Sequence, residues 1–230
     1  MKGRRIKEEE RTRPPFCSLL LFMPDLTLET EFCSKGYRLI AGIDEAGRGA
    51  WAGPVVATAI ILPLDQPERL QSLIAAGVND SKQLTAHQRL RLVPMIEAAA
   101  VAIGVGGASP YQIDREGIVP ATKAAMERAI AMLAPQPQAL LIDAVNLQSF
   151  ISLPQRSLNY GDSISLSIAA ASIIAKVSRD QWMCGLDARH PGYGFARHKG
   201  YGTRAHQLAL KTLGVSEAHR KSYAPIARLM

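Results

Sequence analysis

The chain alternates between short apolar segments with the composition of β-strands and longer segments with helical patterning, and this alternation limits its fold more than any other feature. Strands are predicted where aliphatic and β-branched residues lie between turn residues: 37–44, 55–62, 101–106 and 139–143. Helices are predicted over 85–99, 116–133, 164–189 and 203–213. Mixed strands and helices without an internal repeat, in 230 residues, predict a single α/β domain.

Composition excludes several classes of protein. Hydrophobic residues make up 47% of the chain and charged residues 20%, which argues against wholesale disorder. Three cysteines without metal-type spacing do not form a disulfide framework and indicate a reducing compartment, so we expect a cytoplasmic protein. The longest nearly apolar run, 55–62, is far shorter than the roughly 20 residues that span a bilayer. No membrane partner is therefore expected.

The first residues carry little information about a fold. Residues 1–14 are polar and lack apolar periodicity, which is typical of a disordered tail. The apolar residues 19–23 follow basic ones, as in a secretion signal, but three glutamates, a short apolar stretch and no clear cleavage site argue against one. Met23 is a candidate for the true start of the chain.

Positive charge is unevenly distributed along the chain. The net charge of +7 divides into +3 for residues 1–14, −3 for residues 15–175 and +7 for residues 176–230, which also hold four of the five histidines. A basic C-terminal segment beside a mildly acidic body predicts a nucleic-acid groove next to a carboxylate site. A solvated basic surface explains the charge alone equally well.

Four carboxylates stand where predicted strands or helices begin or end. Asp44 and Glu45 lie where an apolar strand runs into a turn at Gly47, and a break in the pleat there would let the two neighbouring side chains converge. Asp143 ends another apolar strand, where a carboxylate is costly unless it is paired or metal-bound. Asp162 precedes the long helical run and could be a plain N-cap. Together the four fit a Mg²⁺ or Mn²⁺ site, because these ions prefer oxygen ligands.

Asp180 competes with Asp162 for the place of the fourth carboxylate. If one helix joins the two, their 18 steps at about 1.5 Å each separate them by about 27 Å, so they cannot reach one metal site. Asp180 follows Lys176 by four residues, and this spacing predicts an ion pair on one helix face instead.

Several longer motifs resemble ribonuclease HII, the bacterial type 2 ribonuclease H. In chain order they are Gly42-Ile43-Asp44-Glu45-Ala46-Gly47-Arg48-Gly49, Asp80-Ser81-Lys82, 167–180 (SIAAASIIAKVSRD) and 193–203 (YGFARHKGYGT). The resemblance covers roughly residues 37–225. It implies a ribonuclease H-like α/β fold, with a mixed five-stranded sheet flanked by helices and a helical C-terminal region. The chain then divides into a disordered N-terminal extension (1–36), a catalytic core (37–188) and a basic substrate-binding region packed on the core (189–230).

The resemblance also implies a metal-dependent endoribonuclease. Such an enzyme cleaves the RNA strand of RNA/DNA hybrids, and cleaves at ribonucleotides embedded in DNA, by two-metal-ion hydrolysis that leaves 5′-phosphate and 3′-hydroxyl ends. Two divalent ions, Mn²⁺ or Mg²⁺, are expected in the substrate complex. The resemblance further implies a monomer with a role in ribonucleotide excision repair and DNA replication.

Positions within the motifs suggest roles for individual residues. The family's catalytic and metal-binding carboxylates are matched by Asp44, Glu45, Asp143 and Asp162. The turn whose backbone contacts the ribonucleotide is matched by Gly47, Arg48 and Gly49. Tyr201 matches the tyrosine that senses the sugar at the RNA–DNA junction, where the 2′-hydroxyl distinguishes RNA from DNA. Without the family match, an aromatic ring in a glycine loop would be assigned to core packing.

Other features leave alternatives open. Candidates for phosphate contacts are Arg48, Lys82, Lys176 and Lys199, although any single lysine is more often a solvated surface charge. Trp51 stands where the family usually has a smaller or prolyl residue, and Ala144 stands where the family commonly has a glycine. Both substitutions are expected to alter the local packing of the chain without removing a candidate ligand. The rival functions are another ribonuclease H-like metal nuclease, such as a junction resolvase or transposase, and a non-catalytic nucleic-acid-binding protein.

Overall fold

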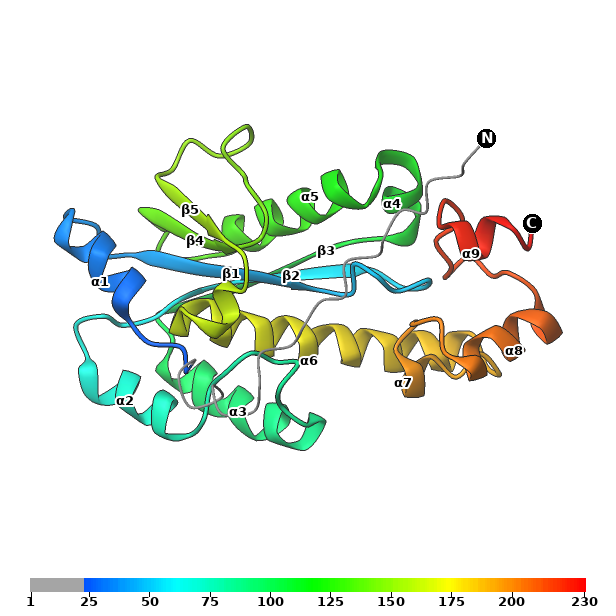
Figure 1. The fold of residues 1–230 in the computed structure, drawn as a ribbon, viewed down its shortest axis with the longest axis horizontal. Helices are drawn as coiled ribbons and strands as arrows, with labels where there is room; N and C mark the ends of the chain where they lie inside the picture. The colour runs from blue at the N-terminus through cyan, green and yellow to red at the C-terminus, as the bar shows by residue number, and fades with distance from the viewer. Residues whose placement is uncertain (1–22) are drawn as a thin grey trace, which may run out of the picture.

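A computed structural model describes residues 23–230 and contains a five-stranded sheet between layers of helices (Figure 1). The strands are β1 (Ile40–Ala46), β2 (Val55–Ile61), β3 (Ala102–Ala108), β4 (Ala139–Asp143) and β5 (Gln155–Leu158). Their order across the sheet is β3-β2-β1-β4-β5. The β1–β2 and β2–β3 pairs are antiparallel, whereas β1–β4 and β4–β5 are parallel. The prediction of a mixed five-stranded sheet is confirmed.

Helices cover both faces of the sheet (Figure 1). On one face α6 (Leu166–Arg189) runs along β1 and β2, with α2 (Pro67–Ala75) and α3 (Ala86–Ala99) in the same apolar cluster. On the other face α5 (Ile118–Ala131) packs against β2 and β3, and it is preceded by α4 (Pro110–Glu116). The two apolar clusters take alternate residues of the strands, as expected for a sheet buried on both sides.

Local sequence signals set the ends of several helices. The Thr85 hydroxyl and the Gln88 side chain form a capping box at the start of α3, as the sequence predicts. Gly117, with a φ of 86°, separates α4 from α5. The single helix predicted over 116–133 is therefore wrong at its N-terminal end, because a left-handed residue cannot continue an α-helix.

Small residues let α6 approach β1 very closely. A Cβ atom at Gly42 would lie 2.3 Å from the carbonyl carbon of Ser167 and 2.5 Å from the nitrogen of Ile168. Ala169 to Ala171 follow in α6, and all three are fully buried. The close packing holds the carboxyl-terminal half of β1 beside the first turns of α6.

Residues 23–36 are ordered as part of the core, so the prediction of a disordered extension over 1–36 is wrong for this part. The helix α1 (Thr27–Ser34) buries Leu28 and Phe32, which are spaced to lie on one helix face. The buried Glu29 side chain accepts hydrogen bonds from Ser165 and Ser167 at the start of α6. Residues 1–22, including the predicted tail and the secretion-like stretch before Met23, lie outside the described residues.

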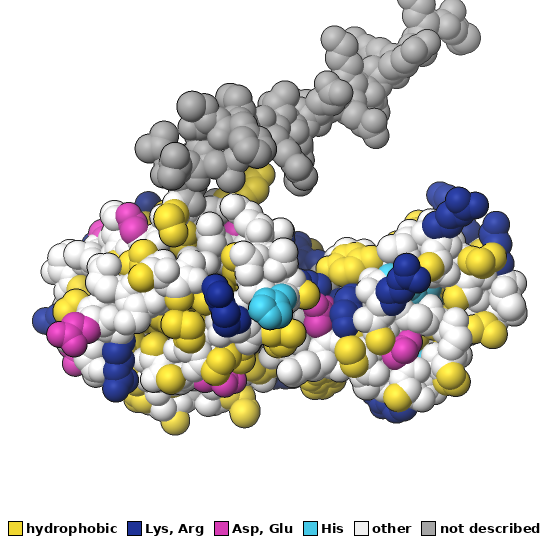
Figure 2. Space-filling model, turned by 90° about the horizontal axis from the view of Figure 1, so that it is seen from below, with side chains coloured by type: hydrophobic (Ala, Val, Ile, Leu, Met, Phe, Trp, Pro, Cys, Tyr) yellow, Lys and Arg dark blue, Asp and Glu magenta, His cyan; other side chains and the backbone are white. Residues whose placement is uncertain are grey.

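The C-terminal segment packs against the far end of α6 (Figure 1). It contains α7 (Phe195–His198), α8 (Arg204–Leu213) and α9 (Ala224–Ala227) around a small apolar cluster. Lys and Arg side chains gather on this end of the molecule (Figure 2). Among residues 23–230, no helix combines the length and the apolar character that crossing a bilayer requires.

Candidate active site

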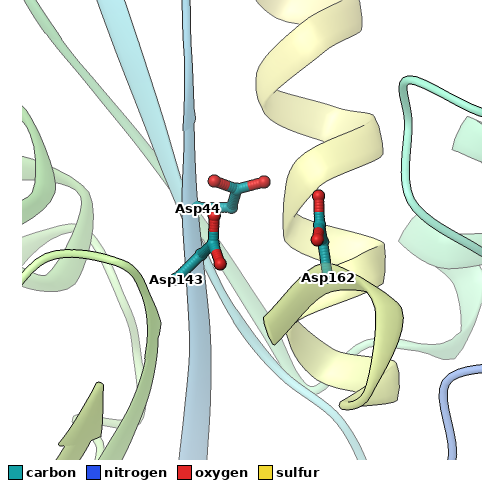
Figure 3. A group of neighbouring side chains, drawn as sticks. All are labelled: Asp44, Asp143 and Asp162. Atoms are coloured by element: carbon teal, nitrogen blue, oxygen red, sulfur yellow. The ribbon is translucent and has the colours of Figure 1, made fainter. Parts of the chain in front are cut away.

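Three aspartates from separate segments meet at the end of the central strands (Figure 3). Asp44 lies near the carboxyl end of β1 and Asp143 ends β4, and these strands are parallel neighbours, so the two side chains lie side by side. Asp162 comes from the 3₁₀ turn η2 (Gly161–Ser163), which leads into α6. One oxygen of each carboxylate lies within 4.8 Å of the others. Oxygen ligands at this spacing suit a hard divalent cation.

One oxygen of each of these carboxylates accepts a hydrogen bond from the protein. Asp143 Oδ1 accepts from the Gly161 amide at 2.8 Å, which ties β4 to the turn that carries Asp162. Asp44 Oδ1 accepts from the Glu45 amide at 2.7 Å. No hydrogen bond among residues 23–230 uses the second oxygen of Asp44, Asp143 or Asp162. Each carboxylate therefore keeps one oxygen that no protein donor occupies and that can serve as a ligand to a cation.

The electrostatics of the cluster lead to the same conclusion. Burial, together with the charges of Glu45, Asp143 and Asp162, raises the pKa of Asp44 well above its usual range. Burial also raises the pKa of Asp143 above its usual value. For Asp162, burial raises the pKa to about 6, although a hydrogen bond from Lys82 opposes the shift. Like charges in a desolvated site favour the binding of a cation that offsets their repulsion.

Lys82 places its ammonium group beside the cluster. Its Nζ lies 2.9 Å from Asp162 Oδ2 and 3.7 Å from Asp80 Oδ1, while 73% of the side chain is exposed. Burial alone would lower the pKa of Lys82, but the hydrogen bond and charge of Asp162 raise it above the usual value. The charged group can therefore approach a polyanion from the solvent side of the carboxylates.

Glu45 lies next to the three aspartates but contributes no oxygen to their cluster. The pairing of β1 with β2 continues through Ala46, so the break in the pleat lies beyond Glu45 and not between the two neighbours. Glu45 Oε1 accepts from Arg48 Nη1 at 3.1 Å, and Oε2 is buried with no partner among the described residues. Burial raises the pKa of Glu45, and the Arg48 charge opposes this.

A cavity of about 520 Å³ opens over Asp44, Glu45 and Asp143, whereas Asp162 lies behind its wall and is buried. Its wall includes residues that the motifs single out: Asp44, Glu45, Gly47, Arg48, Gly49, Ser81, Lys82, Asp143, Lys176 and Tyr201. No hydrogen bond within residues 23–230 uses the amide groups of Arg48 or Gly49. Both residues line the cavity, and a Cβ at Gly49 would meet nothing within 4 Å. The turn therefore offers an open backbone surface to an anionic ligand.

Tyr201 stands at the C-terminal side of this cavity, with 38% of its surface exposed. The Lys176 ammonium lies 5.9 Å and the Arg179 guanidinium 5.5 Å from the centre of its ring. Lys176 also forms the predicted ion pair with Asp180, at 2.7 Å, so that prediction is confirmed. Lys199 is not part of the cavity wall, because its Nζ reaches the Asp180 carbonyl instead.

The two departures from the family pattern have local explanations. The Trp51 ring packs against Gly202, where a Cβ atom would lie 2.2 Å from the indole, and lies 5.8 Å from the centre of the His206 ring. Ala144 has a φ of 53°, in the left-handed region that glycine adopts most easily. Sequence reasoning assigned no role to two arginines that are fully buried beneath the turn 47–54: Arg179, which lies within the motif 167–180, and Arg220. Nothing in the local sequence distinguishes them from surface charges.

Comparisons with known proteins show the family of this chain. A family model described as ribonuclease HII matches residues 41–226. The chain belongs to the ribonuclease HII family. A ribonuclease HII of Chloroflexus aurantiacus is 52% identical over 207 residues, which is 89% of this chain and 95% of that relative. A ribonuclease HII of Geobacillus thermodenitrificans is 52% identical over 198 residues, which is 86% of this chain and 73% of that relative.

Solved structures of the ribonuclease HII type share the fold. The ribonuclease H2 of Pyrococcus horikoshii has a TM-score of 0.69 and 25% identity, over 83% of this chain and 96% of that one. The RNase HII of Archaeoglobus fulgidus, solved in a complex with PCNA, has a TM-score of 0.68 and 25% identity, over 80% of this chain and 95% of that one. The fold and the family thus identify an endonuclease of the ribonuclease H type, and the aspartate cluster is consistent with metal dependence.

Proposed function

We propose that this ribonuclease HII cleaves the RNA strand of RNA/DNA hybrids and also cleaves at single ribonucleotides embedded in DNA. The observation that carries the proposal is the juxtaposition of a carboxylate cluster with an open glycine turn in one cavity. The carboxylates would serve the chemistry at a phosphodiester. The turn and Tyr201 would serve the recognition of the sugar beside it, where the 2′-hydroxyl marks a ribonucleotide.

Asp44, Asp143 and Asp162 would hold the metal, because their oxygens already converge and one oxygen of each accepts no hydrogen bond among the described residues. Divalent ions bound there, two Mg²⁺ or Mn²⁺ in the substrate complex, would activate the attacking water and neutralise charge at the scissile phosphate and the leaving 3′ oxygen. Such hydrolysis leaves 5′-phosphate and 3′-hydroxyl ends. A Bst-RNase HIII of the same fold has been solved with Mn²⁺, at 21% identity and a TM-score of 0.59.

Glu45 would complete the acidic site from its edge. Its buried and unpartnered Oε2 leaves one oxygen free to receive a ligand, while Arg48 holds the other. This role makes Glu45 more tolerant of substitution than Asp44, because it lies outside the group whose oxygens are within 4.8 Å of one another.

Basic groups around the cavity would hold the nucleic-acid backbone. Arg48, Lys82 and Lys176 line the cavity and are the first candidates for phosphate contacts, whereas Lys199 would act further along the duplex. The basic segment 189–230 would extend this surface beyond the core (Figure 2). We further propose that the enzyme acts as a cytoplasmic monomer in ribonucleotide excision repair and DNA replication.

A panel of labelled duplexes tests the proposed function. The substrates are an RNA/DNA hybrid, a DNA duplex with one ribonucleotide and the same duplex of DNA alone, each with Mg²⁺, Mn²⁺ or chelator. The proposal expects cleavage of the first two with either ion, none with chelator and none of pure DNA. Cleavage of pure DNA would favour a resolvase-like nuclease, and binding without metal-dependent cleavage would favour a non-catalytic binding protein.

A further inference from the structure

Arg220 lies beneath the glycine turn and binds its backbone from the interior of the protein. The side chain has no solvent exposure. Its Nη2 donates to the Gly47 carbonyl at 2.7 Å, its Nη1 donates to the Arg48 carbonyl at 2.7 Å, and its Nε donates to the Gly53 carbonyl at 3.0 Å. The Tyr223 hydroxyl donates to the same Arg48 carbonyl and accepts from Arg220 Nη1 at 3.0 Å.

The buried charge of Arg220 has no carboxylate partner. Within residues 23–230, no ion pair includes Arg220, and the same is true of the buried Arg179 beside it. Burial lowers the pKa of Arg220, which shows that its surroundings do not favour a charge. A buried cation without a counterion costs free energy that an apolar side chain of similar size would not. In return for this cost, the rigid, forked guanidinium of Arg220 donates hydrogen bonds to several backbone carbonyls at once.

These bonds determine where the amide groups of the turn point. In a planar trans peptide, the C=O and the following N–H point in opposite directions. The carbonyls of Gly47 and Arg48 are drawn inward by Arg220, so the amides of Arg48 and Gly49 are turned outward. Those are the two amides that donate to no acceptor among the described residues, and both residues lie on the cavity wall.

We infer that Arg220, assisted by Tyr223, is a positioning residue that presents the amides of the glycine turn to the ribonucleotide. The inference rests on the proposed function, because it assigns the turn to substrate. Arg220 does not touch the carboxylate cluster, since all its hydrogen bonds go to the turn and to Tyr223. Substrate recognition and metal binding are therefore predicted to respond separately to its replacement.

Steady-state cleavage of a duplex with one ribonucleotide tests the inference with three variants. Arg220→Lys keeps the charge and loses the fork, and Tyr223→Phe removes one donor to the Arg48 carbonyl. Leu73→Ala is the control, because Leu73 in α2 is fully buried in an apolar cluster that contains neither Tyr223 nor a residue of the turn, so the change destabilises without reaching the turn. KM, kcat, Mn²⁺ affinity and the melting temperature are measured for each variant.

We expect Arg220→Lys to raise KM by about 10-fold or more, because hydrogen bonds from a charged group are among the stronger ones. Mn²⁺ affinity and kcat should stay within about 2-fold, and Tyr223→Phe should raise KM by about 3-fold. Leu73→Ala should lower the melting temperature with KM unchanged.

An unchanged KM in folded Arg220→Lys would overturn the inference, as would an equal rise in KM in Leu73→Ala. If Arg220→Lys does not fold, Tyr223→Phe decides, and an unchanged KM there overturns the inference. A wild-type enzyme that does not cleave at the ribonucleotide overturns the proposed function and the inference with it. Failure of the inference alone is distinct, because the wild type then cleaves normally.

Discussion

Gly42→Ala is predicted to damage both the stability and the metal site of this enzyme. The added methyl group would enter the contact between β1 and α6, where the neighbouring atoms belong to the helix backbone and not to a flexible side chain. It would lie 2.3 Å from the carbonyl carbon of Ser167 and 2.5 Å from both the Ser167 oxygen and the Ile168 nitrogen. Ordinary contacts between heavy atoms are about 3.5–4.0 Å, so strand and helix must separate.

The size of the effect follows from these distances. Relief of the clash needs a relative shift of about 1 Å, the difference between the two sets of distances. Overpacking of this kind costs about 1–3 kcal/mol, and we expect the upper end because the backbone of α6 cannot rotate away. For a chain of this size, 3 kcal/mol corresponds to a melting temperature lower by about 6–12 °C.

The same shift changes the carboxylate cluster. Asp44 follows Gly42 on β1, and Asp162 is joined to the first turn of α6, so moving α6 away from β1 moves these two carboxylates apart. A misplacement of about 1 Å in a site can cost about 100-fold in activity. We therefore expect Mn²⁺ affinity to fall by about 10-fold or more and cleavage to fall at least in proportion.

Thermal unfolding and Mn²⁺ titration by calorimetry measure the two effects in one preparation. Gly107→Ala in β3 is the matched control, because its Cβ would meet only the Val55 oxygen, at an ordinary 3.6 Å. It should leave both quantities nearly unchanged. A Gly42→Ala protein with the melting temperature and Mn²⁺ affinity of the control would refute the packing argument. A loss of stability with normal Mn²⁺ affinity would refute the link between the packing and the site.

Three further predictions concern pH, the N-terminal helix and salt. Burial, with the nearby His206 charge, lowers the pKa of His219 to about 4 from the usual 6.5, so the folded state favours the neutral ring. The contribution of His219 to the free energy of unfolding is therefore complete above pH 6.5 and is lost as the pH falls toward 4. Urea midpoints at pH 7.5 and 5 should differ less in His219→Asn than in the wild type. Glu29→Ala leaves the Ser165 and Ser167 donors without their acceptor and should cost about 2–3 kcal/mol in urea unfolding. Glu31→Ala, which removes a solvent-exposed ion pair with Lys35, should lower stability much less. Duplex affinity against salt should have a log–log slope of about −3 or steeper, because Arg48, Lys82 and Lys176 contact phosphates and the segment 189–230 adds further contacts. Lys176→Ala but not Lys123→Ala should reduce the slope by about 1.

Much of the site could be predicted because its signals are local. Asp44 and Asp143 end apolar segments, and the parallel pairing of β1 and β4 brings such ends together. The separation of Asp162 from Asp180 follows from the rise of one helix, and the structure confirms the ion pair that was expected of Asp180. The position of Glu45 did not follow, because the sequence does not show whether the pleat breaks before or after it.

Features that depend on distant contacts escaped prediction. The strand β5 has a mostly polar sequence and one neighbour, β4, so it lacks the apolar alternation of the other strands. The helix α1 is short, and its Leu28 and Phe32 become informative only against β4 and α6. Arg220 looks like one more charge in a basic segment until the fold buries it under the glycine turn. Burial is a property of the whole chain, so no local pattern reports it.

The proposed function depends most on the aspartate cluster, which would perform metal-dependent cleavage at a ribonucleotide. Single-turnover cleavage of a duplex with one ribonucleotide, by wild type and Asp44→Asn in saturating Mn²⁺, tests it directly. We predict that Asp44→Asn binds the duplex with affinity within about 3-fold of the wild type but cleaves it at least about 1,000-fold more slowly, since the carboxylate acts on the reaction and not on duplex binding. Cleavage by Asp44→Asn at a near-native rate would contradict the account.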